Sequence, residues 1–506
     1  MMSNQSFHPP SLVWTTIGLS LTTFMQLLDT TIANVTLPNI SSSLGACSEQ
    51  GTWVITSFTA SNAIALPMTG WMVRRFGHTR IFLISLLLFI ITSFLCGIAQ
   101  KLSELVIYRT LQGFFAGPLY PISQALLFTI YPTVKRGMAL SLLAMVTVVA
   151  PIVGPLVGGW ITDNYSWSWI FFINIPTGIL AIIIVSVQLK DLSNHTEYQP
   201  IDYIGILLLI AGVSLLQIVL DNGNDLDWFE SNFITISTCI AIMSLIALVS
   251  WELTYQYPII NFRLLKNQNF FVGTLTLILG YSGFFSINLI LPQWLHNQLG
   301  YTSLWCGLAS APIGIFPIFL SPLVGRYGDK LDLRLLACCS FFIIGFSCYM
   351  RSNFTMNIDY NHIAMIQCFM GIGVALFFMP TTNILLSNLL LKDIADGSSL
   401  ATFLRVLGSS LVASLTKWFW QRQHIIHYAQ LIEHISPCSP TTQFYIEKIR
   451  GNKQTIILHL ENIIEEQSTM LSTIDYFTLV GRLFFLLILL ILFAKPPFIY
   501  NQTNKK

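Results

Sequence analysis

One acidic residue, Asp29, lies deep in the first long apolar stretch of this 506-residue chain, and no other acid lies deep in the next five stretches. An ionisable group inside a membrane segment is costly, so each one is a functional candidate. A carboxyl group there could bind and release a proton as burial and nearby charges change. The alternative is a structural carboxylate permanently paired with an arginine. Three polar side chains surround Asp29 in sequence: Gln26, Thr30 and Asn34.

Arg109 is the candidate partner of Asp29, in the segment Arg109-Thr-Leu-Gln112-Gly113. Because a guanidinium stays charged in proteins, it needs an acceptor or water. It could tune a carboxylate or bind an anionic cargo, or it could extend its charged end to the membrane surface. The same alternatives stay open for Arg405 and Arg482 in the last apolar stretches.

A proline- and glycine-rich run follows in the fifth apolar stretch, at Pro151, Gly154, Pro155, Gly158 and Gly159. Glycines four residues apart allow helix backbones to approach closely, and prolines bend helices. This pattern favours a close-packed helix that seals one side of a cavity.

The composition indicates a membrane protein, with 54% hydrophobic residues, 9% charged residues and a mean hydropathy of +0.67. A spanning helix needs roughly 20 mostly apolar residues. We expect about fourteen such helices, near residues 12–35, 53–72, 81–100, 104–131, 138–159, 169–189, 203–220, 233–253, 270–296, 304–325, 333–350, 363–391, 398–418 and 476–494. The predicted domains are 1–190 as one six-helix half, 191–265 as two linker helices and 266–506 as the second half.

Lysine and arginine fall mainly in one set of loops, which predicts that both termini are cytoplasmic. Two of these loops are short basic turns that resemble each other and are expected to gate the cytoplasmic side; their key residues are Gly70, Arg74, Arg75, Gly77, Arg80, Gly325, Asp329 and Lys330. Residues 419–475 are expected to form a long outward loop that contains an amphipathic helix. That helix could be a lid or a partner-binding element. A Cys47–Cys438 disulfide on the outward side stays open.

Several function classes have no support in the sequence. Metal-ligand clusters, phosphate-binding loops and catalytic constellations are missing, and the histidines at 424, 427 and 434 are expected to be solvated. We therefore expect no enzyme, no metal, no cofactor and no nucleic-acid partner, and an ion gradient as the energy source. Some of the aromatic residues could line a cavity: Trp53, Phe58, Tyr281, Phe284, Phe285, Trp294, Phe377 and Phe378.

Taken together, these segments resemble the major facilitator superfamily, and within it the fourteen-helix drug:proton antiporters of the EmrB type. The resemblance covers nearly the whole chain and is carried by residues 28–38 (LDTTIANVTLP), 51–57 (GTWVITS), 109–113 (RTLQG), 150–159 (APIVGPLVGG) and 163–174 (DNYSWSWIFFIN). It implies an all-α fold of two six-helix halves with two additional central helices. One departure is Arg74, which stands where the family usually has an acid, so the latch attributed to that acid is not expected in the first half. In the second half, Asp329 followed by Lys330 fits the family pattern.

The resemblance also implies a function. Asp29 and Arg109 would couple proton entry to efflux of hydrophobic, drug-like molecules across a bacterial inner membrane. A periplasmic adaptor and an outer-membrane channel would complete a three-part pump. The alternative is a dedicated exporter of one metabolite, such as a siderophore or a fatty acid. A membrane sensor or enzyme is disfavoured.

Overall fold

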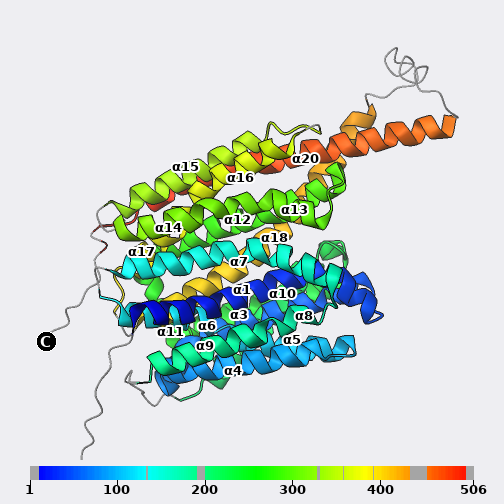
Figure 1. Cartoon of the computed structure of the whole chain (residues 1–506). Coiled ribbons are helices and arrows are strands. Elements are labelled where there is room, and N and C mark those ends of the chain that lie inside the picture. Colours follow the sequence, from blue (N-terminus) through cyan, green and yellow to red (C-terminus); the bar gives the residue numbers. More distant parts are fainter. Residues whose placement is uncertain are drawn as a thin grey trace, which may run out of the picture.

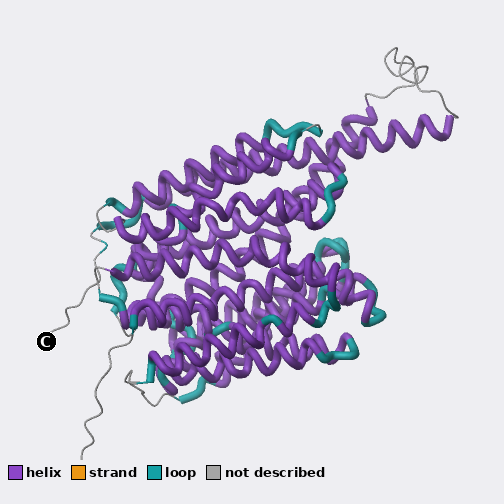
Figure 2. The backbone as a smooth tube through the Cα atoms, viewed as in Figure 1, coloured by secondary structure: helices purple, strands orange, loops and turns teal. Residues whose placement is uncertain are grey.

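The computed structural model describes residues 11–132, 135–190, 200–327, 331–356, 358–390, 393–433, 453–496 and 498. Within these ranges the regular structure is entirely helical. The long helices lie side by side in one bundle (Figure 1), and the described loops lie mainly at its two ends (Figure 2).

The first half of the chain supplies six spanning stretches and one short helix, α2 (Ser48–Gly51). The spanning stretches are α1 (Leu12–Ser43), α3 (Trp53–Phe76), α4 (His78–Gly97), α5 (Leu102–Ala116) with α6 (Leu119–Ile130), α7 (Arg136–Asn164), and α8 (Trp169–Phe172) with α9 (Asn174–Gln188).

Two central helices follow, and then the second half of the chain. They are α10 (Tyr203–Asn222), η2 (Trp228–Glu230), α11 (Asn232–Thr254), η3 (Phe262–Lys266), α12 (Gln268–Leu299), α13 (Ser303–Ser310) with η4 (Ala311–Gly314) and α14 (Ile315–Tyr327), α15 (Leu333–Arg351), α16 (Tyr360–Ala375) with α17 (Phe378–Leu386), α18 (Ile394–Glu433) and α20 (Lys453–Ile491).

Most of the expected spanning segments are confirmed. Twelve helical stretches of the described chain are long and apolar enough to cross a membrane. The other two predicted spans are α1 and α3, with 32 and 24 residues. Their length suffices to cross the apolar core at 1.5 Å per residue. They are less apolar because they bury polar side chains in the bundle, among them Asp29 on α1 and Asn62 on α3.

The predicted outward loop over 419–475 is helical in its described parts, which agrees with the amphipathic helix expected within it but extends beyond that helix. Helix α18 runs unbroken for 40 residues to Glu433, and α20 is a single helix of 39 residues from Lys453. Neither helix contains a proline, the residue that most strongly breaks a helix. The expected amphipathic helix and the last spanning helix are therefore one continuous helix, α20.

Helices α18 and α20 project together beyond the bundle, away from the end at which the described chain begins and finishes (Figure 1). We call these ends the projecting side and the termini side. The projection does not fold back over the bundle as a lid would. The two helices are joined by His427, whose Nε2 lies 2.7 Å from Asp475 Oδ2, and by His424, whose Nδ1 lies 2.9 Å from Ser468 Oγ. These histidines are thus interhelical contacts, which corrects the expectation that they are solvated.

Candidate functional site

The sequence-predicted pair Asp29 and Arg109 meets inside the first half of the bundle. Arg109 Nη1, from α5, lies 2.6 Å from Asp29 Oδ2, from α1, and both side chains are 1% exposed. The other carboxylate oxygen accepts hydrogen bonds from Asn174 Nδ2 at 2.6 Å and from Gln112 Nε2 at 3.1 Å. The carboxylate therefore has a charged partner and two amide donors, which is what a buried anion requires.

Arg109 is also held by groups other than Asp29. Its Nη1 donates to Gln112 Oε1 at 2.8 Å, and its Nε donates to the carbonyl of Val54 at 3.3 Å. The guanidinium lies over the ring of Phe58, 4.2 Å from its centroid. The alternative in which Arg109 extends to the membrane surface is therefore wrong.

The residues predicted to support Asp29 divide into two groups. Gln112 donates a hydrogen bond to Asp29. An added Cβ on Gly113 would collide with the Phe58 carbonyl and Ser61 Oγ. Glycine at position 113 therefore allows α5 to approach α3 closely. The three neighbours in sequence form no side-chain hydrogen bond with Asp29 among the described residues. The Thr30 hydroxyl bonds within its own helix, Asn34 is exposed, and Gln26 is buried with no hydrogen-bond partner for its Oε1.

Sequence reasoning missed two members of this network, Asn174 and Ser93. Asn174 Nδ2 also lies 3.0 Å from Ser93 Oγ, which Gln112 Nε2 reaches at 3.2 Å. Asn174 was noted only as the last residue of a family-like segment. The signal that could have found it is its place at the start of α9, just after the aromatic run of α8.

Two glycines of α7 pack against α1 beside this network. A Cβ on Gly154 would collide with Thr31 Oγ1, and one on Gly158 would lie 3.2 Å from Ile32 Cγ2. Gly159 has no neighbour within 4 Å of that position. The prolines Pro151 and Pro155 lie inside α7, which stays continuous over 29 residues. The glycine pattern thus packs α7 against the helix that carries Asp29.

An ion pair joins the two halves at the termini side. Arg74, at the end of α3, bonds through Nη1 to Asp396 Oδ2, near the start of α18. Gly70 leaves space for this carboxylate, because a Cβ there would collide with Asp396 Oδ1. The sequence interpretation expected no latch at Arg74. The structure instead has an ion pair between the halves in which the first half supplies the base, Arg74, and the second half supplies the acid, Asp396. The sequence analysis had not singled out Asp396.

The other residues of the two basic turns have different surroundings. Arg75 lies over the rings of Trp71 and Phe76, Arg80 is exposed, and Gly77 turns the chain between α3 and α4 with φ +87°. A Cβ on Gly325 would collide with Ser141 Oγ of α7. Asp329 and Lys330 lie outside the described residues, as does Cys438 of the possible disulfide.

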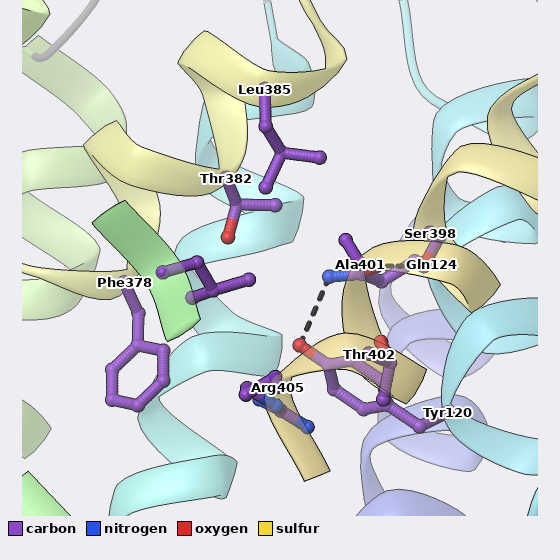
Figure 3. A pocket seen from close by; sticks show the side chains of 10 residues that line it. Tyr120, Gln124, Phe378, Thr382, Leu385, Ser398, Ala401, Thr402 and Arg405 are labelled. Carbon is purple, nitrogen blue, oxygen red and sulfur yellow. Dashed lines mark hydrogen bonds between the residues drawn. The ribbon is translucent and has the colours of Figure 1, made fainter. Parts of the chain in front are cut away.

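A narrow cavity lies between the halves (Figure 3). Its polar wall includes Tyr120 and Gln124 of α6 with Ser398, Thr402 and Arg405 of α18. Ser398 Oγ donates to Gln124 Oε1, and Gln124 Nε2 donates to the Tyr120 hydroxyl at 3.0 Å. The free volume of about 10 Å³ is about what one water molecule requires, so the halves are closed around this site.

Only some of the predicted cavity-lining aromatics reach this space. Phe378 lines the cavity, and Tyr281 contacts both Phe378 and Arg405, with ring centroids 6.0 Å apart in the first pair. Trp294 is buried against Phe354, and Trp53 is half exposed. Arg482 on α20 is exposed, whereas Arg405 is buried.

Comparison with known proteins decides the family. The sequence profile of the Major Facilitator Superfamily matches residues 19–413, most of the chain. The chain belongs to this superfamily.

Within the superfamily, the chain is 44% identical to the Multidrug export protein EmrB of Haemophilus influenzae, over 96% of each chain. It is 43% identical to the Fatty acid resistance protein FarB of Neisseria gonorrhoeae, over 97% of this chain and 98% of the relative. The solved proton:xylose symporter XylE shares the fold with a TM-score of 0.58, covering 94% of both chains at 14% identity.

The family resemblance and the fold class are thereby confirmed: the protein is a multi-pass membrane transporter of the EmrB type with an all-α major facilitator fold. Its family is one of transporters, not of enzymes. Among the described residues there is no group of three or more His, Cys, Asp or Glu that could hold a metal ion.

Proposed function

We propose that the protein exports hydrophobic and amphipathic drugs across a bacterial inner membrane in exchange for protons, without a cofactor. The observation that carries this proposal is the buried Asp29–Arg109 pair on α1 and α5. A buried acid beside a permanent cation is a group whose charge can be switched by one proton.

The surroundings of Asp29 support a proton-binding role. Breaking a buried ion pair by removing one charge normally costs about 3–5 kcal/mol, because the other charge is left uncompensated. Arg109 has two further acceptors, Gln112 Oε1 and the Val54 carbonyl. When Asp29 takes up a proton, these acceptors keep part of the guanidinium satisfied, which lowers that cost. Helix α1 can then move relative to α5, to which the Asp29 side chain links it, while α7 packs closely against α1 through Gly154 and Gly158.

Export of amphipathic compounds is supported by the names of the relatives, which describe multidrug export and fatty acid resistance. The second name also favours the alternative, a proton-coupled exporter dedicated to one endogenous metabolite such as a siderophore or a fatty acid. The two proposals share the coupling site and differ in how many cargos compete for it.

We further propose that the termini side is cytoplasmic and that the protein is the inner-membrane part of a three-part pump. The basic turns after α3 and α14 support this orientation. The projecting ends of α18 and α20 are suited to a periplasmic adaptor, which an outer-membrane channel would follow. These helices expose apolar side chains such as Ile425, Ile432 and Leu458.

The test uses inside-out vesicles in which a proton gradient is established and a panel of hydrophobic drugs is added. We expect drug-dependent loss of the gradient with the natural protein and none with Asp29→Asn. The matched control is Asp225→Asn, which removes an exposed acid between α10 and η2. Full coupled transport by Asp29→Asn would refute the role of Asp29. No response of the natural protein to any drug would leave only the dedicated exporter.

A further inference from the structure

Arg405 is a buried cation with no carboxylate partner among the described residues. Its side chain lines the cavity between the halves and is 5% exposed. The ion pairs of the described chain, which include one for the equally buried Arg109, do not include Arg405. Its Nε has no hydrogen-bond partner. An arginine cannot lose its charge in a protein, so this burial is costly as it stands.

The rings around Arg405 fix its orientation but do not neutralise it. The guanidinium carbon lies 5.2 Å from the ring centroid of Tyr120 and 4.6 Å from that of Tyr281. The hydroxyl of Tyr120 is a neutral group and accepts a hydrogen bond from Gln124 Nε2. Rings over the faces of a guanidinium leave N–H groups at its edge, and these match the two oxygens of a carboxylate.

The site is shared by both halves of the transporter. Tyr120 comes from α6 in the first half, and Arg405 comes from α18 in the second. Figure 3 shows Arg405 beside the Tyr120 ring, with Phe378 and Leu385 around the same space. Because Arg405 lines a cavity between the two halves, a cargo can reach it when the halves separate and the cavity opens.

The other lining side chains define the second part of the cargo. Leu277, Phe378 and Leu385 are apolar, and Phe378 continues into an aromatic group with Phe377, at a centroid distance of 4.8 Å, and with Tyr281. An apolar chain attached to an anionic head would place the head at Arg405 and the chain against these residues. A cationic head would meet a charge of the same sign.

We propose that Arg405 is the specificity-determining residue of the transport site and that it selects amphiphiles with a single carboxylate head. This inference rests on the proposed export function and adds the chemical class of the cargo. The bound carboxylate supplies the counter-charge that none of the described residues places beside Arg405.

The experiment measures equilibrium binding to the full-length protein in lipid nanodiscs, without any proton gradient. The probes are dodecanoate, dodecanol and dodecyltrimethylammonium, which share one alkyl chain and differ in head charge. The natural protein is compared with Arg405→Gln, with Arg405→Lys and with Arg422→Gln, which removes an exposed arginine from the same helix.

We expect Arg405→Gln to bind dodecanoate about 10- to 100-fold more weakly, as for the loss of a charge-assisted hydrogen bond. Its affinity for dodecyltrimethylammonium should stay the same or rise, which also shows that the variant is folded. Arg405→Lys should retain part of the dodecanoate affinity, and Arg422→Gln should retain all of it.

Two outcomes would overturn the proposal. One is an unchanged dodecanoate affinity in Arg405→Gln. The other is an equal loss for all three probes, which would make Arg405 a structural residue. Because no gradient is present, binding does not depend on proton coupling. If the nanodisc assay shows charge-selective binding and the vesicle assay shows no proton-coupled movement of dodecanoate, the proposed antiport is refuted. The role of Arg405 in binding would stay intact.

Discussion

The Arg74–Asp396 ion pair is expected to hold the two halves together at the termini side. It connects α3 to α18, and its side chains are 22% and 8% exposed. An exposed pair contributes about 0.2–1 kcal/mol, while breaking a fully buried pair costs about 3–5 kcal/mol. For this partly buried pair we expect about 1–3 kcal/mol, which changes the ratio of closed to open molecules roughly 5- to 150-fold.

The perturbations form a double-mutant cycle of Arg74→Gln, Asp396→Asn and the two together. Each single substitution should favour molecules that are open at this end. The double variant should destabilise the closed state little more than either single variant does, because all three variants lack the same ion pair. The exchanged pair, Arg74→Asp with Asp396→Arg, should recover part of the closed population.

The assay is a distance distribution between spin labels at Arg80→Cys and Leu331→Cys, in a background without the other reactive cysteines. Both positions are exposed and flank the ion pair on opposite halves. Effects of the two substitutions that add within about 0.3–0.5 kcal/mol would show that the residues act independently. That result would refute the interpretation of the pair as a latch.

Three further perturbations test other parts of the structure. Gly113→Leu should lower the thermal unfolding temperature by several degrees, measured by intrinsic fluorescence, because its side chain collides with the backbone of α3. Asn174→Ala should slow proton-coupled transport about tenfold in the vesicle assay, since Asp29 loses a 2.6 Å hydrogen bond. His427→Ala should increase hydrogen exchange near the tip of α18, with a change in stability below about 1 kcal/mol because its partner Asp475 is partly exposed.

Matched variants separate these effects from general damage. Gly159→Leu places the same side chain on α7, where an added Cβ meets no neighbour within 4 Å, and should unfold near the natural temperature. Equal destabilisation by both glycine variants would contradict the close-packing argument. Natural rates in Asn174→Ala would remove that amide from the coupling network, and unchanged exchange in His427→Ala would show that other contacts join α18 to α20.

The sequence was sufficient to predict the fold class, most of the spans and the meeting of Asp29 with Arg109. Membrane thickness fixes helix length, and a buried acid and a buried base have few partners available. It did not indicate that Asn174 belongs to the same network, because its one signal, a position just after an aromatic run, is weak. It also assigned no role to Asp396, which follows a basic loop and becomes significant only through its position opposite Arg74.

The projecting helices show a different limit of sequence reasoning. A window that detects apolar stretches ends where the composition becomes polar, so residues beyond Trp418 were assigned to a loop. Helix α18 continues because nothing in that sequence breaks the backbone hydrogen bonds, whether or not the surroundings are apolar. Composition indicates where the membrane ends, and it does not determine where a helix ends.

The length of α18 has a mechanical consequence. The same unbroken helix carries Asp396, Arg405 and the projecting end at Glu433. The 28 residues from Arg405 to Glu433 correspond to about 42 Å at 1.5 Å per residue, so a tilt of about 10° at the cavity moves the far end by about 7 Å. The helix is therefore a lever arm. A rearrangement too small to expose the cavity becomes a displacement larger than a side chain outside the bundle, where another protein can sense it.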